Sequence, residues 1–261
     1  MITAGIDLGS ATGKVVIVKN GKILSWSVVR STAKPEKTAL AALEEALEKA
    51  GLKDISELEN IMGTGYGRAN VSFINDNMSE ITCHARGANW LNPSARTVID
   101  IGGQDCKIIS LNDKGKVFEF AMNDKCAAGT GRFCEAMART LDCTLDEFSE
   151  LALKSDNPLM ISKQCSVFAE SEVISLINND ENLCDIAAGL IDSIARRIQA
   201  MAYRVGVVPE VVMTGGGARN KALKISLENK LCLPIADLNI NPQIAGALGA
   251  ALFAYDNATA K

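Results

Sequence analysis

The chain has one histidine, His84, among its 261 residues, and it lacks the marks of several common functional classes. A single histidine argues against catalysis built on a histidine base. The net charge of −4 argues against a nucleic-acid partner, because phosphate backbones are bound by an excess of basic groups. No apolar run is long enough to span a membrane, and the chain does not begin with a basic stretch followed by an apolar segment. We therefore expect a cytoplasmic protein that binds no membrane.

The eight cysteines also lack the spacing of the common metal motifs. No two of them are separated as Cys-x-x-Cys, which argues against a zinc ribbon or a ferredoxin-type cluster within one chain. A disulfide framework is not expected in a cytoplasmic protein. The default for a single cysteine is a small buried apolar residue, and we expect this of Cys106, Cys134, Cys143, Cys184 and Cys232.

What the chain does contain is one short pattern in two copies. The first copy is Ile6-Asp7-Leu8-Gly9, followed by Lys14, and the second is Ile99-Asp100-Ile101-Gly102, followed by Lys107. In both copies a glycine follows the aspartate by two residues and a lysine follows it by seven. An apolar stretch and a second glycine turn come next. This repetition predicts a strand, a tight polar turn and another strand in each of two related lobes.

The remaining hydrophobic pattern is that of an α/β protein. Strands are expected over residues 2–8, 14–19 and 22–30, again from 96 to about 122, and over 211–214 and 233–236. Helices are expected near residues 35–50, 130–142, 145–154, 169–178, 184–205, 219–231 and 242–256. The last of these helices is rich in glycine and alanine, which predicts close packing between helices or lobes.

No low-complexity linker separates the two copies, so the lobes are expected to meet across a cleft. We assign residues 1–93 to the first lobe, joined by the C-terminal helix 242–261. Residues 94–241 form the second lobe, which carries the cysteines Cys126 and Cys165.

The polar turns carry the residue types that a nucleoside triphosphate with Mg²⁺ requires. Glycine turns offer backbone N–H groups, a lysine offers charge, and carboxylates hold the water molecules of the metal. Asp7 and Asp105 are the expected Mg²⁺ ligands, both through water. Gln104 is expected to orient the attacking water, because an amide cannot accept its proton. The expected phosphate-binding residues are Gly9, Ser10, Ala11, Thr12, Gly13, Lys14, Gly102 and Gly103.

A third glycine turn, Gly215-Gly216-Gly217, follows a short apolar strand and is followed by Asn220. Such a turn lets a flat adenosine lie against bare backbone, and Gln243 is a further candidate for this site. A lone glycine turn is usually an ordinary loop. Three such turns, two of them matching copies, are not explained in that way.

The three turns together resemble those of the superfamily that contains sugar kinases, Hsp70-type chaperones and actin. A small-residue helix at Gly246-Ala247-Leu248-Gly249 adds to the resemblance. It implies an α/β fold with two ribonuclease-H-like, actin-like ATPase domains and ATP/ADP in the cleft between them. From these residues alone, a small-molecule kinase and a nucleotide-dependent scaffold remain alternatives.

Two of the cysteines stand in loops of small residues just before predicted helices. Cys126 lies within Met122–Phe133, and Cys165 lies two residues before Val167–Ser175. The N-terminus of a helix stabilises a thiolate, and an anionic iron–sulfur cluster gains from the same field. Two cysteines cannot complete a four-cysteine site, but a two-fold dimer that shares one cluster would supply four.

These two segments resemble the activator (component A) family of 2-hydroxyacyl-CoA dehydratases, ATPases of the BadF/BadG/BcrA/BcrD type. The resemblance covers nearly the whole chain and implies a homodimer with one [4Fe–4S] cluster held by Cys126 and Cys165 of both subunits. It implies that ATP hydrolysis drives one low-potential electron onto a partner iron–sulfur protein. The first phosphate loop, Gly9–Lys14, departs from the usual run of the family, and so does Gln164-Cys165-Ser166.

These departures leave two partners open. The acceptor is either a 2-hydroxyacyl-CoA dehydratase or a double-cubane-cluster protein. The sequence has no flavin or NAD motif, so ferredoxin or flavodoxin is the expected electron donor. The alternative remains a small-molecule (sugar) kinase of the same superfamily.

Overall fold

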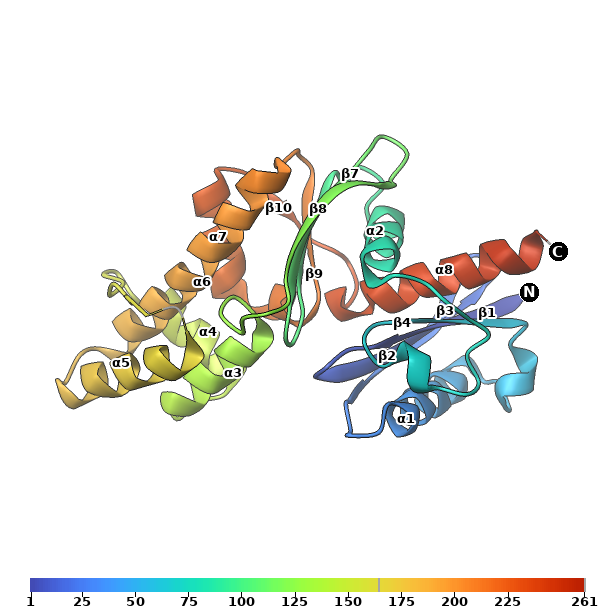
Figure 1. Cartoon of the computed structure of the whole chain (residues 1–261), viewed down its shortest axis with the longest axis horizontal. Coiled ribbons are helices and arrows are strands. Elements are labelled where there is room, and N and C mark those ends of the chain that lie inside the picture. Colours follow the sequence, from blue (N-terminus) through green and yellow to red (C-terminus); the bar gives the residue numbers. More distant parts are fainter. Residues whose placement is uncertain (164, 261) are drawn as a thin grey trace.

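The computed structural model describes residues 1–163 and 165–260, and Gln164 and Lys261 lie outside the described residues. The described part of the chain forms two five-stranded sheets (Figure 1). The first sheet has the order β3-β2-β1-β4-β5, with β1 Ile2–Leu8, β2 Thr12–Lys19, β3 Lys22–Arg30, β4 Asn60–Thr64 and β5 Asp76–Asn77. The second has the order β10-β9-β6-β7-β8, with β6 Thr97–Ile101, β7 Cys106–Leu111, β8 Val117–Asn123, β9 Val211–Thr214 and β10 Ile235–Ala236.

Both sheets have the same topology, which confirms the predicted duplication. Each consists of an antiparallel three-strand meander whose first strand also pairs with a parallel strand. The register places Asp7 opposite Lys14 and Asp100 opposite Lys107. The seven-residue spacing of the repeated motif is therefore the register of a hairpin, and it places an aspartate and a lysine side by side on one sheet.

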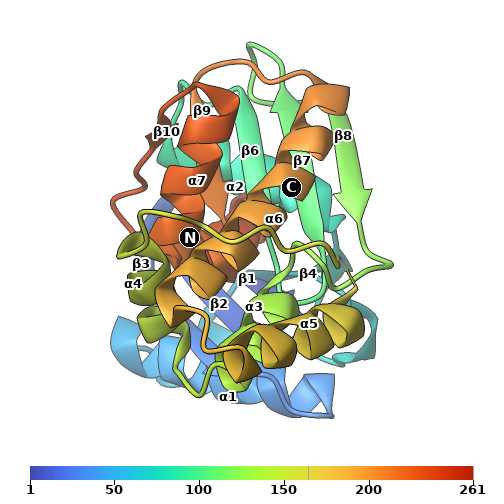
Figure 2. The ribbon, with the colours of Figure 1, turned by 90° about the vertical axis from the view of Figure 1, so that its left-hand side faces the viewer.

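The helices lie on both faces of each sheet (Figures 1 and 2). They are α1 Pro35–Ala50, α2 Glu80–Leu91, α3 Gly131–Thr140, α4 Leu145–Leu153, α5 Ser166–Asn178, α6 Leu183–Val205, α7 Lys221–Leu231 and α8 Ala245–Thr259. Short 3-10 turns cover 55–57, 68–70, 216–219 and 242–244. Helix α1 begins with a proline in its first turn and ends at Gly51 in the left-handed conformation, as its sequence predicts.

The four consecutive apolar residues of β2 are all buried, because helices cover both faces of this strand. Val15 and Ile17 pack with α1, whereas Val16 and Val18 pack with α8. The second sheet is covered in the same way, since β6 packs against α3 and α6 on one face and against α2 on the other. Burial on both faces favours a continuous apolar run over an alternating one.

Helices α2 and α8 lie between the two sheets and contact each other closely (Figure 1). A Cβ on Gly249 would overlap the carbonyl oxygen of Cys83, and a Cβ on Gly87 would overlap that of Ala245. The close packing predicted for the small-residue helix is therefore present. Helix α8 packs on the first sheet. Helix α2, which precedes residue 93, contacts both α8 and the strands of the second sheet. Because α2 contacts both lobes, the lobe boundary after residue 93 stays a prediction.

Among the described residues, no helix combines the length and the apolar character that crossing a bilayer requires.

Candidate functional site

A pocket lies between the two sheets, where the polar turns of both copies face each other. Most of the residues expected to bind the nucleotide line it. They are Asp7, Gly9, Ser10, Ala11, Thr12, Lys14, Gly102, Gly103, Asp105, Gly215, Gly216, Gly217, Asn220 and Gln243. The three turns, which are distant in the sequence, thus surround one space.

Two of the expected residues do not line this pocket. Gly13 belongs to β2, and a Cβ there would overlap the side chain of Thr38 on α1, so its lack of a side chain serves packing. Gln104 is exposed at the tip of the second turn, between the lining residues Gly103 and Asp105. Its role in orienting water stays a prediction.

In the first turn, Asp7 and Lys14 form a buried pair. The Lys14 Nζ lies 3.1 Å from Asp7 Oδ2, and the turn is closed by a hydrogen bond from Gly9 N to Thr12 O at 3.1 Å. The other oxygen, Asp7 Oδ1, is buried and has no hydrogen-bond partner among the described residues. A buried carboxylate oxygen without a donor is rare. It suits the water shell of a divalent cation, so the residues present fit Mg²⁺.

In the second turn, Lys107 lies among three carboxylates. Its Nζ is 2.9 Å from Glu80, 2.9 Å from Asp105 and 3.3 Å from Asp100, and its side chain is 1% exposed. Burial lowers the pKa of Lys107, but the three carboxylates outweigh burial and raise it well above its usual value. Burial likewise raises the pKa of Asp100, but His84 and Lys107 lower it to about 2.

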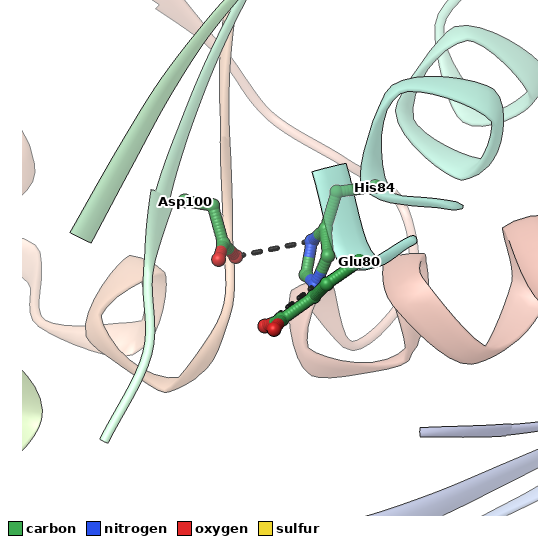
Figure 3. Close-up of side chains that lie close together, drawn as sticks. All are labelled: Glu80, His84 and Asp100. Carbon is green, nitrogen blue, oxygen red and sulfur yellow. Dashed lines mark ion pairs between the residues drawn. The ribbon is translucent and has the colours of Figure 1, made fainter. Parts of the chain in front are cut away.

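His84 and Glu80 were missed by reasoning from the sequence. His84 Nδ1 lies 3.1 Å from Asp100 Oδ1 (Figure 3). It also lies 3.3 Å from Thr214 Oγ1, which donates to Asp100 Oδ1 at 2.8 Å. Helix α2 thereby contacts Asp100 of β6 and Thr214 of β9, and Glu80, His84 and Asp100 themselves line the pocket. The only signal in the sequence is the spacing of Glu80 and His84, which puts both on one face of a helix.

Ligand atoms of Glu80, His84 and Asp100 lie within 4.8 Å of one another, a spacing that could hold a metal ion. Lys107 already forms ion pairs with Glu80 and Asp100. These contacts make the group a balanced network of charges, in which a cation would have to displace the lysine.

The two cysteines assigned to the cluster lie on loops. Cys126 is half-buried, five residues before α3 begins, and Asn123 Nδ2 donates to its carbonyl oxygen at 2.9 Å. Cys165 is exposed and is the N-cap residue of α5. Helices α3 and α5 contact each other, and Phe133 of α3 and Ala169 of α5 are buried in the same core.

The five cysteines expected to be buried follow that expectation only in part. Cys106 and Cys134 are buried, as is Cys83, to which the sequence assigned no role, and burial raises the pKa of Cys83 and Cys134 to about 12. Cys143 and Cys184 are half-buried. Cys232 is exposed, so the expectation of burial was wrong there; it is the C-cap residue of α7, in the left-handed conformation.

The second phosphate turn is bonded directly to the start of α3. The backbone N–H groups of Gly131 and Arg132 donate to the carbonyl oxygens of Gly102 and Gly103, each at 2.9 Å. These N–H groups belong to the first turn of a helix, where intrahelical partners are lacking. The pocket and the segment that carries Cys126 are thus one continuous hydrogen-bonded unit.

Two lobes of the same topology, with a pocket between them lined by two aspartate-glycine turns and a glycine-rich third turn, define the actin-like ATPase class. The chain belongs to the BadF/BadG/BcrA/BcrD ATPase family, whose family model matches residues 4–254. This confirms the family that the motifs around Cys126 and Cys165 predict.

Relatives match over almost their whole length. A protein of Anaerotignum propionicum, named activator of lactoyl-CoA dehydratase, is 47% identical over 261 residues, 100% of both chains. The solved structure of the activator of the 2-hydroxyisocaproyl-CoA dehydratase from Clostridium difficile, with bound ADPNP, has a TM-score of 0.94 at 42% identity and covers 100% of this chain and 96% of that one. Component A of the (R)-2-hydroxyglutaryl-CoA dehydratase from Acidaminococcus fermentans also has a TM-score of 0.94 at 42% identity, with 99% of each chain covered.

Proposed function

We propose that this chain is an ATP-dependent, low-potential electron donor. As a homodimer it would share one [4Fe–4S] cluster, held by Cys126 and Cys165 of both subunits. ATP hydrolysis would drive one electron to a partner iron–sulfur protein, a 2-hydroxyacyl-CoA dehydratase or a double-cubane-cluster protein, with ferredoxin or flavodoxin as the donor. The names of the relatives as dehydratase activators support this proposal.

The observation that carries the proposal is the bond between the pocket and the Cys126 segment. A phosphate held by the Gly102–Gly103 turn would act on α3 through two backbone hydrogen bonds. Thr130 Oγ1 donates to Ala127 O at 2.6 Å, so the loop back to Cys126 moves with the start of the helix. ATP can change the arrangement of the loops only through a different affinity for two arrangements. Contacts to phosphate from both lobes would provide that difference.

The remaining residues would bind and orient the nucleotide. Asp7 and Asp105 would hold the waters of Mg²⁺, Lys14 would neutralise phosphate charge, and Gln104 would orient the attacking water. The glycines 215–217 would receive the adenosine. The metal would supply charge neutralisation at the phosphates.

The cysteine environments also fit this assignment. Cys165 is exposed at the start of a helix, where a thiolate is stabilised, and Cys126 is only half-buried. Burial holds Cys83 and Cys134 in the thiol form, which does not bind iron. The bound cluster would carry a single electron.

A small-molecule kinase would need a free carboxylate as the base near the γ-phosphate. Asp100 and Asp105 are the candidates, and both are paired with Lys107. That pairing weighs against the kinase.

Replacing either Cys126 or Cys165 by serine is expected to abolish the cluster. After anaerobic purification, the parent protein should be brown, contain iron and sulfide, and give an EPR signal on reduction. Cys126→Ser and Cys165→Ser should be colourless and free of iron. The matched control is Cys232→Ser, an exposed cysteine outside both loops, which should keep its full iron content. Full iron content in either of the first two variants would refute the assignment.

Replacing Asp7 by asparagine is expected to slow ATP hydrolysis about 10- to 100-fold, the usual effect of losing an outer-shell partner of a metal. The measurement is the steady-state ATPase rate at several Mg²⁺ concentrations. Asp113→Asn, at a fully exposed side chain, is the control and should leave the rate unchanged. A rate for Asp7→Asn within twofold of the parent rate would contradict the metal role of Asp7.

A further inference from the structure

Between the end of α4 and the start of α5, the structure describes residues 154–163 and Cys165, and none of these described residues belongs to a helix or strand. The middle part of this segment is held on α6, where Leu159 N donates to Asp185 O at 3.0 Å. A Cβ on Gly189 of α6 would overlap the carbonyl oxygen of Leu159, so the two segments are in direct contact. Ile161 is buried in the same core. The chain then leaves α6, and Ser162 and Lys163 are both exposed.

Ser162 and Lys163 are instead hydrogen-bonded to a side chain of the following helix, α5. Glu172 lies in the second turn of α5, and its carboxylate reaches back across the start of that helix. Its Oε1 accepts from Ser162 N at 2.9 Å and from Ser162 Oγ at 2.8 Å, and its Oε2 accepts from Lys163 N at 2.8 Å. Bonds from N–H groups to a carboxylate are about twice as strong as those between neutral groups.

The ionisation of Glu172 agrees with these bonds. Partial burial raises its pKa, but the N–H groups of Ser162 and Lys163 outweigh burial and lower the pKa below its usual value. Glu172 is therefore charged at neutral pH. Glu170 is a second acidic residue of α5 with an exposed side chain, and it provides a comparison on the same helix.

We infer that Glu172 is the positioning residue of Cys165: it fastens the loop before this cysteine to the helix after it. This inference rests on the proposed function, in which Cys165 binds the cluster. Ligands of a metal site must be held within about 0.5 Å of their working geometry. Because Glu172 and Cys165 belong to the same helix and its N-cap, the fastened loop and α5 move as one unit.

The first test uses cluster-free protein. Hydrogen exchange at the amides of Ser162 and Lys163 is measured in the parent, in Glu172→Ala and in Glu172→Gln. Loss of hydrogen bonds to a charged acceptor should speed exchange about ten- to a hundredfold in Glu172→Ala. Glu172→Gln keeps one acceptor oxygen and should fall between the two. Glu170→Ala is the matched control and should exchange like the parent.

The second test uses the protein after anaerobic reconstitution with iron and sulfide. The rate at which a ferrous chelator removes iron should rise about tenfold in Glu172→Ala and stay at the parent value in Glu170→Ala. Melting temperatures of the cluster-free variants, equal to that of the parent, separate this effect from unfolding.

Three results would overturn the inference. They are exchange in Glu172→Ala within twofold of the parent, an equal rise in Glu170→Ala, and iron loss that does not change in Glu172→Ala. A parent protein that takes up no iron would instead refute the proposed function, and with it the role of Cys165 as a ligand. The hydrogen-exchange result distinguishes these failures, since it requires no cluster.

Discussion

Replacing Lys107 by methionine is expected to lower the free energy of unfolding by about 3–5 kcal/mol, the usual cost of removing one partner of a buried ion pair. The side chain of Lys107 is 1% exposed and contacts three carboxylates, those of Glu80, Asp100 and Asp105. Methionine fills a similar volume but leaves these negative charges together in a buried site. The effect therefore comes from charge and hardly from packing.

Denaturation with urea, followed by circular dichroism, measures this loss. Lys49→Met is the control, because Lys49 pairs with Glu45 at an exposed position and such pairs contribute below about 1 kcal/mol. The double variant Lys107→Met/Asp100→Asn should be more stable than Lys107→Met alone, since it also removes one of the three carboxylate charges. A loss below about 1 kcal/mol in Lys107→Met would contradict a buried network of charges around this lysine.

Replacing Gly249 by alanine is expected to destabilise the protein by about 3 kcal/mol, the upper part of the range for overpacking. A Cβ at this position would overlap the carbonyl oxygen of Cys83, which is main chain of α2 and cannot rotate away. Helices α2 and α8 would have to separate. Since α2 also carries Glu80 and His84, which line the pocket, the separation would displace them.

The sign of this effect is informative. In an exposed helix, alanine in place of glycine stabilises by about 1 kcal/mol. Ala41→Gly, at an exposed position of α1, measures that preference in this chain and should cost about the same amount. Gly87→Ala should resemble Gly249→Ala, because its Cβ would overlap Ala245 in the same crossing. Any gain of stability in Gly249→Ala would show that the backbones of the two helices do not touch at this crossing.

Local patterns made the sheets and the polar turns that line the pocket predictable. The spacing of Asp7 and Lys14 is the register of one hairpin, so neighbours in the sequence are neighbours in space. The same is true of Asp100 and Lys107. The family resemblance assigned Cys126 and Cys165, a choice that spacing alone leaves open.

The residues that the sequence did not reveal depend on tertiary packing. Glu80 and His84 reach the pocket only because α2 lies between the two sheets, a position that no local pattern encodes. Glu172 accepts a hydrogen bond from Ser162, which lies ten residues earlier in the sequence. From the sequence alone, an acidic residue in a helix is expected to be exposed to solvent. Cys232 is exposed at the C-cap of α7, where the chain leaves the helix.

The bonds from Gly131 and Arg132 to the second phosphate turn have a consequence for how this protein tolerates mutation. Both donors and both acceptors are main-chain groups. No side chain takes part, so substitutions in α3 after Gly131 leave these four groups in place, provided that position 132 keeps its N–H group. At Gly131 itself a Cβ would lie 3.1 Å from the carbonyl oxygen of Gly102, so a side chain there would crowd the connection. The connection between the Gly102–Gly103 turn and the segment that carries Cys126 therefore depends on main-chain groups, which most substitutions leave unchanged.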